Sequence, residues 1–364
     1  MYGEAETEVF SRRDVDVDDL IRIGRRQRVA GVNYSTDVSR PVYFDPVPEK
    51  MAASLSKALP GTPQISIMDS TTDENKLLVL AGGDVDLGVY YLFDRKARQL
   101  QTFLVVRNEL EGVKLATVKP VNYPAADGTQ IPGYLTLPPG QESAKGLPAI
   151  VLPHGGPSAR DVWGFDWLSQ FYASRGFAAL QPNFRGSFGY GDAWFQQNGF
   201  KSWRIAIGDV LDAGRWLVSQ GIADPAKLAV VGWSYGGYAA LQAAVTDPSV
   251  FKAVVAIAPV TDLQAMKDER RNWSDYYLVS DFIGDGAHVR EGSPAENADK
   301  IKAPVLMFHG VLDGNVPIEQ SRRMAASLDR AGVRHERVTW DELDHQLENS
   351  AARTEMLRKS DAFL

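Results

Sequence analysis

Residues 230–238 read Val-Val-Gly-Trp-Ser-Tyr-Gly-Gly-Tyr, and this stretch decides how the rest of the chain is interpreted. An apolar, β-branched run leads into it, and the alanine-rich residues 238–244 that follow have the pattern of a helix. A strand, a sharp turn flanked by glycines and a helix form the context in which Gly-x-Ser-x-Gly makes a nucleophile elbow. The helix start then directs N–H groups at the serine. The pattern predicts that Ser234 is a nucleophile; the alternative is a glycine-rich turn with an unreactive serine.

Strands alternate with helices on both sides of this turn. We interpret apolar runs as strands at 148–152, 177–181, 228–231, 250–257, 305–308 and 334–339, after a hairpin formed by 115–121 and 131–137. Helical patterns occupy 163–174, 207–219, 318–331 and 350–363. Nearly continuous apolar strands that alternate with helices predict a mainly parallel sheet with helices on both faces.

Candidate functional residues follow several of these strands. In an open α/β sheet, the site lies at the carboxyl ends of the strands. There the sequence places His154-Gly155-Gly156-Pro157, the loop from His309 to Val316, and Asp344-His345. The chain order serine, aspartate, histidine is that of the α/β-hydrolase fold. We therefore predict an α/β-hydrolase catalytic domain over residues 113–364.

A serine hydroxyl needs a base within hydrogen-bond reach, and His345 is the candidate. Asp313 follows a strand and a glycine turn, so it is the predicted carboxylate that orients His345. The competing carboxylates are Asp262, Asp281, Asp341, Glu342 and Asp344. We expect structural roles for His154 and His309, and solvated side chains for His288 and His335.

A tetrahedral intermediate needs two N–H donors. The residue after the nucleophile supplies one in this fold, and a glycine-rich loop after an earlier strand supplies the other. These positions are Tyr235 and Gly156, with Gly155 as the alternative donor. A plain glycine turn is the other interpretation of the Gly155-Gly156 loop.

Residues 1–112 are rich in strands and turns. Four short strands, 65–68, 77–81, 89–94 and 100–106, predict one antiparallel sheet. The runs 29–34 and 41–45 repeat this pattern in part, and Asp45 and Asp94 lie 49 residues apart. A helix is expected at 51–59. The spacing is typical of a β-propeller, although there is room for only about two blades. Either these strands close no ring or the chain is a fragment; a plain antiparallel sheet is the alternative.

Composition excludes several classes of protein. A length of 364 residues suits two domains, and a net charge of −7 with a pI near 5.4 argues against nucleic acid or an anionic membrane as the main partner. No apolar run is long enough to span a membrane and the N-terminus has no signal-peptide pattern, so we expect a soluble protein, cytoplasmic or periplasmic. The histidine spacing predicts no metal site, and no cofactor is expected. Exposed strand edges in residues 1–112 predict a homo-oligomer.

The motifs together resemble the prolyl oligopeptidase family of serine peptidases, especially its dipeptidyl-peptidase and acylaminoacyl-peptidase branches. The resemblance rests on the glycine-rich turns after His154 and around Ser234, on the 183–191 stretch Asn-Phe-Arg-Gly-Ser-Phe-Gly-Tyr-Gly, and on the segments containing Asp313 and His345. It implies that short peptides are cleaved, and that a propeller limits the access of substrates to the active site. This chain resembles the family over its hydrolase domain and over a truncated propeller only.

The resemblance also implies positions for substrate contacts. An apolar pocket would be formed by Tyr235, Val260, Trp273, Tyr276 or Tyr277, and Val316. A buried aromatic cluster is the alternative for 273–277. Asn315 resembles an asparagine that holds a substrate carbonyl in some members. The chain departs from the family in having no counterpart of the paired propeller glutamates and in the Gln346-Leu347 sequence after His345.

The leading hypothesis is a serine hydrolase that cleaves short peptides or aminoacyl amides through an acyl-enzyme on Ser234. His345 would be the general base and Asp313 its orienting carboxylate. The alternative is a carboxylesterase that acts on small esters with the same triad. A catalytically inactive interaction module is the hypothesis from a different class.

Overall fold

The computed structural model describes residues 7–61, 63–196 and 199–364, and the chain divides into two compact units. The first comprises Met1–Val118, Val162–Asp166 and Gly189–Gly191, and the second comprises the remaining segments. The sequence predicted a boundary between residues 112 and 113, whereas the first long segment of the structural unit ends at Val118.

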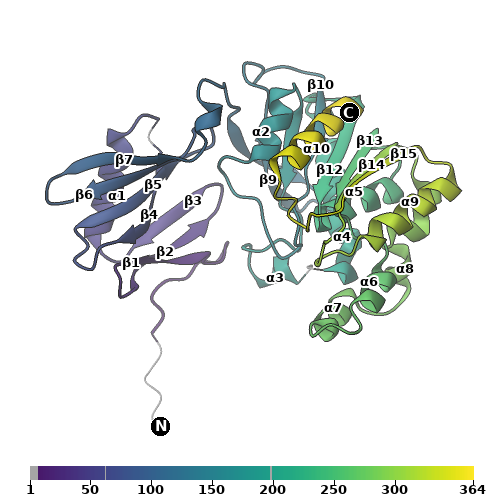
Figure 1. Ribbon diagram of the computed structural model, residues 1–364, viewed down its shortest axis with the longest axis horizontal. Coiled ribbons are helices and arrows are strands. Elements are labelled where there is room, and N and C mark those ends of the chain that lie inside the picture. Colours follow the sequence, from purple (N-terminus) through teal and green to yellow (C-terminus); the bar gives the residue numbers. More distant parts are fainter. Residues whose placement is uncertain (1–6, 62, 197–198) are drawn as a thin grey trace, which may run out of the picture. The chain divides into compact units, whose positions relative to one another are not determined.

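The second unit contains an eight-stranded sheet with the order β15-β14-β13-β12-β10-β11-β9-β8 (Figure 1). The five strand pairs from β15 to β11 are parallel, and β9 pairs antiparallel with β11. The strands are β8 Val118–Pro124, β9 Gln130–Thr136, β10 Leu147–Val151, β11 Ala178–Pro182, β12 Ala223–Trp233, β13 Ala253–Ile257, β14 Val305–Gly310 and β15 His335–Trp340. The predicted α/β fold with a mainly parallel sheet is confirmed.

Helices cover both faces of this sheet because the strand side chains alternate between two apolar cores. In β12, Leu228 and Val230 contribute to one core, while Ala229 and Val231 contribute to the other. The first core includes α4 Trp203–Ser219, α5 Tyr235–Thr246 and α9 Glu319–Ala331, and the second includes α2 Trp167–Ser174 and α10 Ser350–Phe363. Strands buried on both faces explain the uninterrupted apolar runs in the sequence.

The predicted helices differ from the observed ones mainly where helices are short. The helix expected at 163–174 begins only at Trp167, and Gly164 before it has a φ of +149°. No element was predicted in 263–300, where the structure has α6 Leu263–Glu269, α7 Tyr276–Ile283, α8 Ala287–Glu291 and η3 Pro294–Lys300. Helices of this length show too few turns for a periodic pattern in the sequence. The other short helices of the second unit are α3 Asp192–Phe195 and η2 Phe200–Ser202.

Within its described residues, the first unit contains two antiparallel sheets and one α-helix. One sheet comprises β1 Asp19–Ile23, β2 Arg28–Ser35 and β3 Ser39–Tyr43; the other comprises β4 Gln64–Ser70, β5 Lys76–Gly82, β6 Val89–Asp94 and β7 Gln99–Val105; η1 is Asn108–Leu110. The repeat in the sequence therefore covers three strands. Helix α1, Pro46–Ala58, follows β3 at the point of the repeat where β7 follows β6. It starts five residues before the predicted helix because Asp45 caps it by accepting a hydrogen bond from Val47 N–H.

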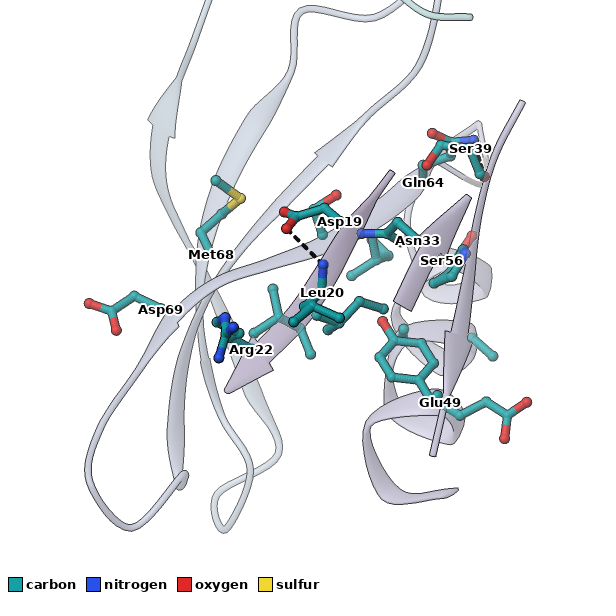
Figure 2. A pocket seen from close by; sticks show the side chains of 18 of the residues that line it. Asp19, Leu20, Arg22, Asn33, Ser39, Glu49, Ser56, Gln64, Met68 and Asp69 are labelled. Atoms are coloured by element: carbon teal, nitrogen blue, oxygen red, sulfur yellow. Dashed lines mark hydrogen bonds between the residues drawn. The ribbon is translucent and has the colours of Figure 1, made fainter. Parts of the chain in front are cut away.

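A cavity of about 690 Å³ lies in the first unit, lined from β1, β4 and α1 (Figure 2). Its polar lining includes Asp19, Asn33, Glu49 and Gln64. The Asp19 carboxylate accepts a 2.7 Å hydrogen bond from the Leu20 N–H. All residues that line this cavity belong to the first unit, whereas the predicted triad belongs to the second.

Among the described residues, no helix has the length and apolar character that crossing a membrane requires. Within the same ranges, no group of three or more histidine and carboxylate side chains is arranged to hold a metal ion.

Candidate active site

The turn at Ser234 has the backbone geometry of a nucleophile elbow. β12 ends at Trp233, α5 begins at Tyr235, and Ser234 between them has φ 60° and ψ −120°. A side chain at Gly232 would overlap the Gly236 carbonyl, and one at Gly236 would overlap the Pro153 carbonyl. The flanking glycines are thus required by close backbone packing, and a non-glycine residue with positive φ between them is typical of a functional site. The Ser234 side chain is partly exposed.

His345 and Asp313 form a buried pair beside this turn. His345 Nδ1 lies 2.6 Å from Asp313 Oδ2, and both residues are buried. The Trp233 indole N–H donates a 3.0 Å hydrogen bond to the His345 carbonyl, which ties the histidine loop to the residue before Ser234. His345 and Asp313 therefore lie together at the carboxyl edge of the sheet, and the loop of His345 is hydrogen-bonded to the residue that precedes Ser234.

Close packing of two loops holds this pair together. The Leu312 N–H donates to the Leu343 carbonyl at 2.9 Å, which joins the loop after β14 to the loop after β15. At Gly310, an added Cβ would lie within 2.5 Å of the Asp344 carbonyl oxygen and would overlap the Leu343 carbonyl. Glycine at the end of β14 is needed for this approach.

The Asp313 carboxylate accepts hydrogen bonds at both oxygens. Oδ1 accepts from the N–H groups of Asn315 and Val316, each at 2.8 Å. Oδ2 accepts from His345 and lies 3.1 Å from His309 Nε2. Burial disfavours the ionised form, but the hydrogen bonds from the two histidines and the Val316 N–H outweigh it, so the pKa of Asp313 lies well below its usual range. The group is a carboxylate at neutral pH.

The competing carboxylates with described partners are engaged elsewhere. Asp262 caps α6 by accepting from the Ala265 N–H at 2.9 Å. Asp281 pairs with Lys201 at 3.0 Å, and Asp344 accepts from the Gln346 N–H within its own turn. Asp313 is the carboxylate that meets His345.

The other histidines make contacts within the protein. His288 Nε2 lies 2.8 Å from the Ile283 carbonyl and His335 Nδ1 lies 3.1 Å from the Val333 carbonyl. Both rings are half-buried, so the expectation that they are solvated was wrong; neighbouring carbonyls provide partners that the sequence does not reveal. His309 is packed and hydrogen-bonded as expected, but its contact with Asp313 was not foreseen.

The glycine turn at 155–156 lies against the elbow. A Cβ at Gly155 would lie 3.1 Å from the Trp233 carbonyl oxygen and 3.5 Å from Ser234 Cβ. Gly156 has a φ of +111°. Tyr235 is the first residue of α5, where the N–H has no partner within the helix. The arrangement makes N–H groups from both segments candidates for an oxyanion hole.

The residues expected around the substrate differ widely in exposure. Val260 and Val316 are buried in the first core, and the Tyr235 ring is buried against Phe184 and Phe200. Tyr276 is half-buried, while Trp273 and Tyr277 are 56% and 82% exposed. The alternative of a buried aromatic cluster at 273–277 is therefore wrong, since this segment leads into the short helix α7 at the protein surface.

Arg270 has a structural role that the sequence did not indicate. Its guanidinium Nη2 donates to the carbonyls of Gly314 and Asn315, at 2.6 and 2.5 Å. Its Cζ lies over the Trp273 ring, 4.7 Å from the ring centroid. The residue is buried. Arg270 thus links the segment after β13 to the loop that carries Asp313. Because its partners are backbone carbonyls, no residue type in the sequence marks them.

Acid should destabilise the fold through His154. The ring stacks on Phe184 with centroids 4.3 Å apart, its Nε2 lies 2.7 Å from Ser187 Oγ, and burial lowers its pKa to about 4 from 6.5. Below pH 6.5 the unfolded chain binds this proton more readily than the folded one, so stability present above pH 6.5 is lost as the pH falls towards 4. The loss is at most about 3 kcal/mol for this shift.

Urea unfolding between pH 7 and pH 4.5 measures this effect. His154→Gln should flatten the decline in the free energy of unfolding, whereas His335→Gln, on β15, is the control for loss of one histidine. An equally steep decline in both variants would show that His154 is not responsible.

Residues 163–364 match the model of the prolyl oligopeptidase family. Dipeptidyl aminopeptidase BIII from Pseudoxanthomonas mexicana is 30% identical over 325 residues, which cover 85% of this chain and 46% of that protein. Acylamino-acid-releasing enzyme 1 from Oryza sativa subsp. japonica is 28% identical over 239 residues, 61% of this chain and 30% of that enzyme. The chain thus spans less than half the length of these two curated relatives.

A solved structure shows the same fold over the whole chain. A puromycin-hydrolyzing peptidase from Mycobacterium tuberculosis superposes with a TM-score of 0.82 and 23% identity, covering 100% of this chain and 56% of that one. The β-rich first unit corresponds to the propeller part of such neighbours. Since the family model matches more than half of its residues, the chain belongs to the prolyl oligopeptidase family.

Proposed function

We propose that this chain is a serine hydrolase that cleaves short peptides or aminoacyl amides. One observation carries the proposal: the elbow serine lies at the sheet edge where Trp233 anchors the loop of His345, and His345 is paired at 2.6 Å with the buried Asp313. Relatives named as a dipeptidyl aminopeptidase and an acylamino-acid-releasing enzyme support peptide and aminoacyl amide substrates.

In the proposed mechanism, Ser234 Oγ attacks the scissile carbonyl and His345 Nε2 takes the hydroxyl proton. Asp313 binds Nδ1 of His345, which leaves Nε2 to face Ser234, and the carboxylate stabilises the imidazolium once it forms. N–H groups of Tyr235 and Gly156 stabilise the oxyanion. His345 then gives its proton to the departing amine, which leaves an acyl group on Ser234. Water, deprotonated by His345, releases the acid and restores the serine.

We propose that the apolar first pocket has Val260 and Val316 at its base and aromatic residues of 273–277 at its wall. The burial of the two valines supports this arrangement, and the exposure of Trp273 and Tyr277 leaves part of each ring accessible to a ligand. Asn315 follows Asp313 in the same loop and would bind a substrate carbonyl.

Comparing an aminoacyl p-nitroanilide with the matching p-nitrophenyl ester tests the proposed substrate class. We expect the chain to hydrolyse both, because a general acid positioned for an amine also serves an activated ester. Robust ester turnover without amide cleavage would instead establish the carboxylesterase.

A fluorophosphonate should label Ser234 and no other serine, which peptide mapping can determine.

We propose further that β7 mediates self-association. β7 is the last strand in its sheet, and Phe103 and Leu104 on it are 62% and 53% exposed. Edge strands with unpaired N–H and carbonyl groups readily pair with another chain. Light scattering should give a mass that rises with concentration, and Phe103→Lys should lower it. A monomer mass at every concentration would contradict this proposal.

A further inference from the structure

The buried histidine His309 contacts the carboxylate that orients the general base. It lies near the end of β14, its side chain is fully buried, and it has hydrogen-bond partners on both ring nitrogens. Nδ1 is 2.6 Å from Ser321 Oγ on α9. Nε2 is 2.8 Å from the Val316 carbonyl and 3.1 Å from Asp313 Oδ2.

These partners determine which nitrogen carries the proton. A carbonyl and an ionised carboxylate can only accept, so Nε2 must be protonated and must donate. A neutral imidazole then has its lone pair on Nδ1, which accepts a hydrogen bond from the Ser321 hydroxyl. Ser321 and the Val316 carbonyl therefore favour one tautomer of His309, in which the N–H is directed at Asp313.

Asp313 consequently receives four donors: two backbone N–H groups on Oδ1 and two imidazoles on Oδ2. The four directions fix the plane of the carboxylate, and hence the direction in which Oδ2 meets His345 Nδ1. The His309 hydrogen bond also takes up part of the negative charge that would otherwise act on His345.

We propose that His309 and Ser321 are positioning residues that hold the Asp313 carboxylate in place and moderate its attraction for the protonated form of His345. The inference rests on the proposed function, since it assigns these residues a role in that reaction. The charged and titratable groups around Asp313 come from several elements: His309 from β14, His345 from the loop after β15, and Arg270 from the end of α6, whose guanidinium binds the loop carbonyls.

Four substitutions separate the positioning role from simple packing. His309→Leu removes the donor, whereas the amide N–H of His309→Gln can still reach the carboxylate. Ser321→Ala removes the hydroxyl that anchors Nδ1 of His309, whereas Ser321→Thr keeps it. Ser327→Ala, a buried serine on the same helix, is the matched control and should leave activity unchanged.

Two readouts apply to all these variants. We expect kcat to fall about tenfold in His309→Leu, the effect of one lost hydrogen bond to a charged group, and by a smaller factor in Ser321→Ala, where the His309 ring loses one anchor and its bond to Asp313 is weakened. Without that bond, Asp313 favours the protonated base more strongly, so the acidic limb of the kcat/KM profile should move to higher pH by about half a unit or more. His309→Gln and Ser321→Thr should restore both values.

Proton NMR provides a measurement that does not depend on turnover. The proton between His345 Nδ1 and Asp313 Oδ2 should give a low-field resonance, which should shift in Ser321→Ala and His309→Leu but not in Ser327→Ala. An inactive wild-type protein with this pattern of shifts would contradict the proposed function and support the positioning role.

An unshifted resonance and an unchanged pH profile in Ser321→Ala would overturn the inference, even if His309→Leu fails to fold. Equal impairment of His309→Gln and His309→Leu, with the pH profile in place, would likewise show that the residue only fills space.

Discussion

Ser234→Ala should lower kcat for an aminoacyl anilide by about 10⁶, because the three side chains of a triad act as a unit. The substitution removes only the hydroxyl from a turn whose backbone is fixed by Gly232 and Gly236. KM should change little, since the oxyanion donors and the pocket are retained. Residual catalysis of about 10³ over water is expected from those donors.

The control for this experiment is Ser219→Ala, at an exposed serine whose hydroxyl binds the Trp216 carbonyl in α4. It should retain full activity. Circular dichroism and the unfolding midpoint of both variants should match the unsubstituted chain. A Ser234→Ala protein that keeps more than a few per cent of its activity would exclude this serine as the nucleophile.

The features that were predictable from the sequence are those that local patterns determine. The alternation of β and α segments follows from continuous apolar strands, and the elbow follows from two glycines with a serine between them. Ser234 comes directly after its strand, and Asp313 and His345 follow theirs after short loops. Because parallel strands present their carboxyl ends at one edge, placing each residue after its strand predicted that the three share this edge, and the contact between His345 and Asp313 agrees with that prediction.

The features that were missed depend on tertiary contacts. The segment 263–300 contains four short helices that are too brief for a periodic signal and that are stabilised by packing. Arg270 binds backbone carbonyls, which any sequence provides. The His309–Asp313 contact needed the turn geometry between β14 and α9, which residue spacing alone does not give.

The residues at the carboxyl edge of the sheet therefore form two groups, which differ in how far the sequence reveals them. The side chains that would touch substrate follow strands and are visible in the sequence. The groups that hold them in place, among them Trp233 and Arg270, act through the backbone carbonyls of the loops they fix. Substitutions in this second group should alter orientation and pH dependence more than they remove activity.

Asp313→Asn tests the orientation of the general base most directly, and we expect it to lower kcat by about 10⁴. In the native protein every donor around this side chain is directed at an acceptor: two N–H groups at Oδ1, and two imidazoles at Oδ2. An asparagine must place its NH₂ group against one of these pairs. With the amide nitrogen towards His345, the imidazole gains a lone pair at Nδ1 and carries its proton on Nε2, where it cannot accept the proton of Ser234.

The alternative orientation of the amide does not rescue activity, because the NH₂ group would then face the N–H groups of Asn315 and Val316. Asp313→Ala should lose a similar factor without introducing this conflict, so a comparison of the two separates the wrong tautomer from the missing charge. Both should be measured across pH 6–10, where hydroxide can partly replace the general base, and the deficit in Asp313→Asn should shrink as the pH rises. A deficit below tenfold at neutral pH would mean that another carboxylate orients His345, and Asp344, its neighbour in the chain, would be the first to test.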